Sequence, residues 1–389
     1  MKITDVTTIT LTYQMDRAMA DAIHYMPARP TLLVQVHTDA GITGLGESAA
    51  YGGSLESMQA VIGDLRQTVL GEDPFTVERL WSKMATQAHQ RGRRGMLMMG
   101  ISGIDIALWD IIGQATKTPL YRLLGGYRDT IDAYASAGFY SKGKDAKALA
   151  KEVGGYVDRG FRTVKIKIGR NPDVMFNPLH DMNAQDYATA SFEEDIERVR
   201  AASKAVATAK LAIDANNAWT APVALKFMRA INDLENIAWL EEPVATEDLA
   251  GSAEIAHLLD TPIAGYETET GLPGFRNLIT QRAVDIVQPD VIWTGGITET
   301  RKIAALAQAF HLPVIPHVFS SAVSTIANMH LIASLPNAGL LECDQNPNPL
   351  RSELFEEPIT VDKNGQVHLP DGPGLGVRLN QKTIDKYQL

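Results

Sequence analysis

The chain has little cysteine, no clusters of basic residues and no long uninterrupted apolar run. Cys343 is the single cysteine, which excludes an intramolecular disulfide and fits a reducing, cytoplasmic location. There are 36 basic residues against 46 acidic ones, a formal net charge of −10. Nucleic acid is therefore not an expected partner, because its phosphates require clustered positive charge. No run has the length expected of a signal peptide or membrane span, so no membrane is expected as a partner either.

Residues 1–125 have the pattern of strands followed by helices. Residues 2–13 and 31–38 alternate and are rich in β-forming residues. The turn Asp39-Ala40-Gly41 leads into a further strand, as in a hairpin. From about residue 54 to 124 the apolar residues recur at helical spacing. This pattern predicts a small α+β domain.

Residues 126–357 contain short apolar runs, in most cases followed by a helical segment. The runs are IDAYAS, RTVKIKIG, AKLAIDAN, IAWLEEP, TPIAGYE, VDIVQPD, LPVIPHV and GLLECD. Eight such units predict an α/β fold, a (β/α)8-type (modified TIM) barrel capped by the N-terminal domain. Residues 358–389 are predicted to pack back on the capping domain. The polar stretch 169–190 is longer than ordinary connections, which is typical of a functional lid or a disordered segment.

From the second run onward, every run ends in an ionisable residue. The active site of a (β/α)8 barrel lies at the C-terminal ends of its strands, so these side chains are expected to share one rim. They are Lys165 and Lys167, Asp214, Glu241 and Glu242, Glu267, Asp290, His317 and Glu342.

Asp214, Glu241 and Glu267 end three successive runs, so their carboxylates are expected to converge. Three adjacent carboxylates repel one another unless a cation lies between them. Ligands that are all oxygen suit Mg²⁺ better than zinc. We therefore predict one Mg²⁺ per subunit at this trio; each residue taken singly could also be a solvated rim carboxylate.

Lys165 and Lys167 are two residues apart, so a strand directs both into the barrel mouth. Each ammonium disfavours protonation of the other, which predicts a lowered pKa and a general base at Lys167, with Lys165 supplying positive charge. His317 ends a distant strand, and Asp290 on the neighbouring strand is expected to orient its ring as a second base. Structural lysines and a structural histidine are the alternative interpretations.

Glu342 lies in the apolar run GLLECD, which is expected to raise its pKa. A protonated carboxyl there could donate a hydrogen bond to a developing oxyanion, whereas the alternative is a carboxylate paired with a lysine or arginine. Together these residues predict removal of a proton next to a carboxylate through an enediolate. Either racemisation or loss of a β-hydroxyl could follow.

The sequence resembles the enolase superfamily, specifically its mandelate racemase-like branch, over essentially the whole chain. The matching motifs are SGIDIALWDIIGQA, KIKIG, IDAN, WLEEP, AGYE, QPD, PHV and LLECD. The resemblance implies that Lys167 and the His317–Asp290 pair are the bases on opposite faces of the substrate. It also implies that Asp214, Glu241 and Glu267 bind the metal.

The resemblance implies that Asn216 contacts substrate, with a structural strand-end role as the alternative. It further implies that residues 15–30 (a loop by our prediction) and 48–55 close over the substrate. Candidate contacts to the distal end of the substrate come from these segments. They are His24, Tyr25, Arg29 and Tyr51.

The last part of the chain, LECDQNPNPLRSEL and LPDGPGLGV, resembles galactarolactone cycloisomerases and aldarate dehydratases of this branch. A sugar acid or its lactone is the implied substrate, and a dimer-based homo-oligomer, up to an octamer, the implied assembly. Dehydration to a 2-keto-3-deoxy acid, lactone isomerisation and racemisation or epimerisation remain open, as does a non-catalytic sugar-acid binding protein. Tyr266 replaces a glycine usual in the family, which predicts a narrower substrate pocket.

Overall fold

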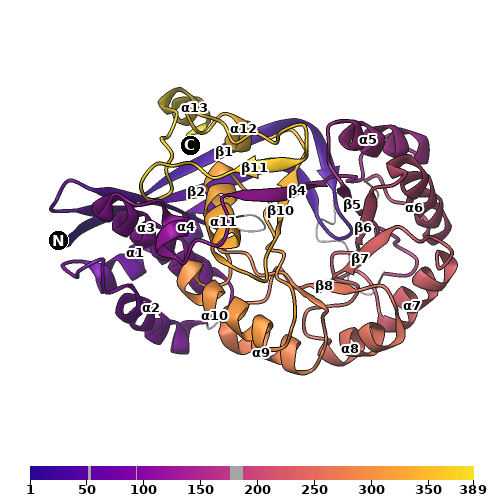
Figure 1. The fold of residues 1–389 in the computed structure, drawn as a ribbon, viewed down its shortest axis with the longest axis horizontal. Coiled ribbons are helices and arrows are strands. Elements are labelled where there is room, and N and C mark those ends of the chain that lie inside the picture. Colours follow the sequence, from indigo (N-terminus) through magenta and orange to yellow (C-terminus); the bar gives the residue numbers. More distant parts are fainter. Residues whose placement is uncertain (51–53, 93, 176–186) are drawn as a thin grey trace.

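The computed structural model describes residues 1–50, 54–92, 94–175 and 187–389, which form a capping domain beside a barrel (Figure 1). The capping sheet is antiparallel, in the order β1-β2-β3. Its strands are β1 (Ile3–Ala20), β2 (Tyr25–Thr38) and β3 (Thr43–Ser48). Helices follow it: α1 (Leu55–Val69), α2 (Val77–Arg91), α3 (Met96–Thr116) and α4 (Leu120–Leu123).

The hairpin of β1 and β2 is longer than the sequence predicts. Residues 15–30 are not a loop: Met19 pairs with Met26, and Ala20 with Tyr25. A register shift between Gln14 and Met19 interrupts the pairing of β1 with β2. The alternation of inward and outward side chains is broken there, so the sequence lacks the period-two pattern by which a strand is predicted. The two prolines of β2 are tolerated because this part of β2 lies beyond its pairing with β3.

The barrel is a ring of parallel strands, in the order β10-β4-β5-β6-β7-β8-β9. The strands are β4 (Thr130–Ser136), β5 (Thr163–Lys167), β6 (Lys210–Asp214), β7 (Ile237–Glu241), β8 (Ile263–Gly265), β9 (Ile286–Val287) and β10 (Leu340–Asp344). The seventh predicted run closes the ring only through Val314, which bridges Val287 and Ala338. The predicted barrel fold is therefore confirmed.

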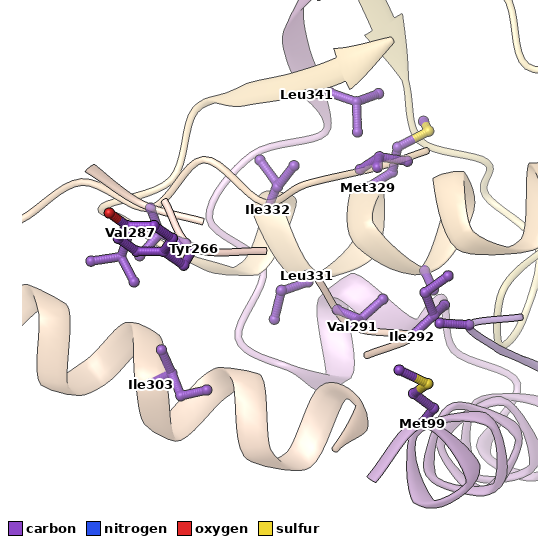
Figure 2. Packing of buried hydrophobic residues seen from close by; sticks show 14 of the residues in the cluster. Met99, Tyr266, Val287, Val291, Ile292, Ile303, Met329, Leu331, Ile332 and Leu341 are labelled. Atoms are coloured by element: carbon purple, nitrogen blue, oxygen red, sulfur yellow. The ribbon is translucent and has the colours of Figure 1, made fainter. Parts of the chain in front are cut away.

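Helices surround the ring and bury its outer face (Figure 1). They are α5 (Ala146–Asp158), α6 (Phe192–Val206), α7 (Ala221–Ala230), α8 (Leu249–Leu258), α9 (Gly271–Thr280), α10 (Gly296–Ala309) and α11 (Ala322–Ser334). The short helix α12 (Pro349–Ser352) contacts α11 and β1. Figure 2 shows part of this core, to which α10 contributes Ile303 and α11 contributes Ile332. Met99 of α3 and Ile292 of the loop after β9 belong to the same core, so it is continuous from barrel to cap.

The C-terminal residues contact both domains. Strand β11 (Gln366–His368) pairs antiparallel with β4, and helix α13 (Gln381–Tyr387) lies against β1. The amide of Leu389 donates to the carbonyl of Thr10 at 3.1 Å. The backbone of this segment thus links the barrel to the capping sheet.

Helix α3 is long and apolar enough to cross a bilayer, contrary to the expectation that no run reaches that length. Within the fold, however, 89% of its most apolar window is buried, as in the core helix of a globular domain. It packs closely on β3 because both surfaces carry glycine. A Cβ atom at Gly46 would lie 2.0 Å from the carbonyl oxygen of Gly103.

Candidate active site

A cavity of about 410 Å³ lies where the capping domain meets the C-terminal ends of the barrel strands. The barrel contributes Phe139, Lys167, Asn216, Glu267, Thr268, Trp293, His317 and Phe319. The capping domain contributes Asp21, His24, Tyr25, Met26, Ala49, Ala50, Met58, Met96 and Met99. The structure therefore brings six predicted site residues to one cavity: Lys167, His317, Glu267, Asn216, His24 and Tyr25.

The strand register aligns the predicted bases and metal ligands. Lys167 lies opposite Asp214 in the pairing of β5 with β6, and Asp214 lies opposite Glu241 in the pairing of β6 with β7. Lys167 donates to the Asp214 carboxylate in a short contact. The three side chains thus meet at one edge of the sheet, as the ends of parallel strands must.

Lys165 lies beneath the cavity and is fully buried. It donates to Glu241, lies 2.8 Å from Glu342 and lies 3.7 Å from Asp214. Burial disfavours its ammonium, but the Glu241 and Glu342 carboxylates outweigh that cost and raise the pKa of Lys165 well above its ordinary value. Lys165 therefore carries a positive charge beneath the cavity.

The sequence predicted a lowered pKa for Lys167, and this prediction is wrong. Burial and the neighbouring Lys165 both lower it, yet the adjacent Asp214 carboxylate raises the pKa of Lys167 above its ordinary value. The spacing of the two lysines along one strand is local, whereas the direct pairing of Lys167 with Asp214 depends on the neighbouring strand β6. Lys167 is consequently an ammonium here.

His317 is held between two carboxylates. Its Nδ1 lies 2.8 Å from Asp290 Oδ2, and its Nε2 lies 3.2 Å from Glu267 Oε2. Burial lowers the pKa of His317, but Glu267 and the Asp290 hydrogen bond together raise it to about 10. Asp290 thus orients the ring, and Nε2 faces the cavity side.

The raised pKa expected of Glu342 is wrong, because charged neighbours surround its carboxylate. Burial raises its pKa, but Lys165, His317 and Lys167 outweigh burial and lower the pKa of Glu342 to about 2. Its Oε2 also accepts a hydrogen bond from the Val318 amide at 2.9 Å. Glu342 is therefore the carboxylate paired with a lysine, not a protonated donor to an oxyanion.

The predicted metal ligands fit Mg²⁺ in their chemistry. All donors are carboxylate oxygens, and Glu267 Oε2 is buried with no hydrogen bond, although His317 Nε2 lies 3.2 Å away as a charged neighbour. Among the described residues, no group of three histidine, cysteine or acidic side chains is arranged so that it could hold a metal ion. Asp214 and Glu241 are bonded to lysines instead, and Glu241 also accepts from Trp239 at 2.8 Å and Gln288 at 3.0 Å.

Glu242 was read from the sequence as a strand-end group but given no role. Its carboxylate accepts from the Asn217 side chain at 2.6 Å and from the Glu267 amide at 2.8 Å. Burial and the nearby Glu267 carboxylate raise the pKa of Glu242 well above its ordinary value. Glu242 therefore fixes the backbone that carries Glu267.

The capping hairpin places an ion pair on the cavity wall. His24 Nδ1 lies 3.0 Å from Asp21 Oδ2, and Asp21 Oδ1 accepts from the amides of Ile23 and His24 at 2.9 and 2.7 Å. The sequence singled out His24 but missed Asp21. An aspartate three residues before a histidine, at the start of a tight turn, is the signal that could have found it.

Two other expectations about the substrate pocket are wrong. Arg29 does not line the cavity: it is buried, lies 3.0 Å from Asp344 and stacks 3.9 Å from the centre of the Phe319 ring. It therefore supports Phe319 from behind. Tyr266 points away from the cavity and donates to the Ser252 hydroxyl at 2.9 Å, so it does not narrow the pocket. Tyr51 lies outside the described residues.

Comparison with known proteins agrees with this arrangement. The mandelate racemase/muconate lactonizing enzyme N-terminal domain matches residues 4–125, and the enolase C-terminal domain-like family matches residues 148–383. The chain is 40% identical to an arabinonate dehydratase of Saccharolobus solfataricus, over 99% of both chains. It is 32% identical to a D-galactarolactone cycloisomerase of Agrobacterium fabrum, over 100% of this chain and 99% of the other.

A solved structure of a Streptomyces coelicolor racemase with bound magnesium superposes with a TM-score of 0.86 at 28% identity, over the full length of both chains. The agreement therefore extends over both domains, in sequence and in fold. The chain belongs to the mandelate racemase/muconate lactonizing enzyme family of the enolase superfamily.

Proposed function

We propose that this protein is a Mg²⁺-dependent dehydratase that removes the α-proton of a sugar acid and releases its β-hydroxyl as water. The observation that carries the proposal is that Lys167 and His317 line the same cavity from the second and seventh strand positions of the ring. Two proton-transfer groups on different sides suit a reaction that takes one proton and delivers another. The similarity to a full-length arabinonate dehydratase supports the same reaction class.

Asp214, Glu241 and Glu267 would hold the ion, which when bound would withdraw negative charge from the substrate carboxylate. Lys165 pairs with Glu241 and lies 3.7 Å from Asp214, so it neutralises part of the charge of these two carboxylates. With the ion bound, Asp214 and Glu267 would no longer raise the pKa of Lys167 and His317 as they do here, so one of the two could be neutral. The neutral residue takes the α-proton and the protonated one gives its proton to the β-hydroxyl, so that the C–O bond breaks and water leaves. The resulting enol takes up a proton at C3 and loses the proton of its C2 hydroxyl, which gives the 2-keto-3-deoxy acid.

Isomerisation of a sugar-acid lactone is the second candidate, favoured by the 32% identity to a galactarolactone cycloisomerase. It would use the same α-proton removal, with the lactone ring oxygen as the leaving group. Racemisation or epimerisation would need only the two proton transfers, without a leaving group. The same two residues would serve in each case.

Proton NMR in D₂O separates these reactions. Aldonates, aldarates and their lactones would be incubated with enzyme and Mg²⁺, with EDTA as the control. Loss of the α-proton signal with a deuterated 3-deoxy product establishes dehydration or lactone isomerisation, and the ring state of the product decides between them. Exchange with inversion alone means an epimerase, and no exchange with any compound rejects the sugar-acid proposal.

A further inference from the structure

The two walls of the active-site cavity differ in polarity. The barrel wall supplies Lys167, Glu267 and His317, where the carboxylate and α-carbon of a sugar acid would react. Of the nine described residues on the capping wall, six are methionine or alanine. They are Met26, Ala49, Ala50, Met58, Met96 and Met99. An ordinary polyhydroxy chain would find few hydrogen-bond partners along the described part of this wall.

Among the described residues of the capping wall, the polar groups are the His24–Asp21 pair and the Tyr25 hydroxyl. His24 and Asp21 are joined at 3.0 Å, so their charges largely cancel. No lysine or arginine belongs to the described part of this wall. Among these described residues, a second substrate carboxylate would meet only the His24 cation, which Asp21 already neutralises, and it would face the Asp21 carboxylate.

We infer that the substrate is a monocarboxylic sugar acid whose last carbon is a methyl group, a terminal-deoxy aldonate, with one hydroxyl facing the His24–Asp21 pair. This inference rests on the proposed function. The methyl end packs against Met58, Met96 and Met99, where a terminal hydroxyl would lose its water without gaining a partner. The thioether side chains suit such an irregular apolar end because they are flexible and polarisable.

The test compares kcat/KM for each terminal-deoxy hexonate with the matching hexonate, pentonate and hexarate of the same configuration. An apolar pocket rejects an added hydroxyl by about 100-fold at most, so a preference of about 10- to 100-fold for the deoxy acid is expected. A higher kcat/KM for the hexonate, the pentonate or the hexarate overturns the inference. Absence of α-proton exchange with every sugar acid would instead reject the proposed function itself.

Variants locate the preference on the capping wall. Met96→Gln and Met99→Gln introduce an amide of similar length, which can bond a terminal hydroxyl, and should reduce the preference for the deoxy acid by about tenfold. Met175→Gln makes the same change outside the cavity lining and should leave the ratio unchanged. Because the readout is a ratio, partial loss of folded protein does not affect it. An unchanged ratio in both cavity variants overturns the inference.

Discussion

The guanidinium of Arg170 donates a hydrogen bond to the backbone carbonyl of His24 at 3.3 Å. The same Nη1 lies 3.1 Å from the carbonyl of Asp21 and 3.3 Å from that of Ala22. Arg170 follows Lys167 by three residues, so one barrel loop carries both a candidate base and the anchor of the capping turn. The position of the His24–Asp21 pair over the cavity thus depends on a barrel residue.

Arg170→Ala should weaken the joint between the domains. Hydrogen bonds from a charged donor contribute about 1.5–3 kcal/mol each at most, so we expect the free energy of unfolding to fall by about 2–4 kcal/mol and KM to rise. Urea unfolding and steady-state kinetics measure both. Arg200→Ala, which removes an exposed pair with Asp233, is the control and should cost no more than about 1 kcal/mol. Equal effects of the two variants would contradict the anchoring role.

Asp21→Asn should lower the pKa of His24. Burial lowers that pKa, but the Asp21 charge and hydrogen bond outweigh burial and raise it above its ordinary value. Without the carboxylate only the burial effect and weaker charges remain, so the imidazole should lose its proton at lower pH. NMR titration of the His24 ring measures this change. The exposed-turn variant Asp39→Asn should leave the titration as in the wild type, and an unmoved pKa in Asp21→Asn would refute the pairing.

Glu47→Gln should flatten the dependence of stability on pH. Burial raises the pKa of Glu47 from 4.5 to about 7, despite hydrogen bonds from Ser320, Ser321 and Ser324. Between these values the folded protein binds more protons than the unfolded chain, so this group contributes stability at low pH that is lost as pH rises through about 7.

The stability that Glu47 contributes relative to glutamine should therefore be larger at pH 5 than at pH 8. Thermal unfolding of both proteins across this range measures the difference. Other buried carboxyls titrate in both proteins and cancel in the comparison. A difference that stays constant from pH 5 to pH 8 would show that Glu47 is ionised throughout and would contradict this prediction.

Lys167→Ala and His317→Asn should each abolish turnover. General acid–base catalysis contributes about 10²- to 10⁴-fold, so kcat should fall at least that far in each variant. The residue that takes the α-proton is identified by loss of α-proton exchange in D₂O. Circular dichroism serves as the folding control, since Lys167→Ala leaves Asp214 without its partner. Wild-type rates in either variant would refute the assignment of that residue.

Mg²⁺ should raise the melting temperature, and EDTA should reverse the rise. A ligand present at 100 times its Kd stabilises a protein by about 2.7 kcal/mol. Glu267→Gln should abolish this shift because it removes a proposed carboxylate ligand. Glu269→Gln is the matched control, two residues further on and outside the cavity lining, and should retain the shift. Retention of the shift in Glu267→Gln would remove Glu267 from the ligand set.

The sequence alone determined the barrel and the ionisable ends of its strands. Period-two and period-3.6 patterns report which face of each element is buried, and the C-terminal ends of parallel strands necessarily share one rim. Lys167, Glu267 and His317 could therefore be assigned to one site before their distances were known. The hairpin through residues 15–30 could not be predicted, because its register shift and prolines disguise a strand.

Only the tertiary structure decided the electrostatic state of the site and the composition of the capping wall. The pKa values of Lys167 and Glu342 depend on which neighbour lies closest, and strand order alone does not give that distance. Arg29 and Tyr266 lie in segments near the cavity, yet their side chains point into the protein. Met58 and Met96 meet Lys167 across the cavity only because two domains pack together, and no local sequence pattern encodes such contacts.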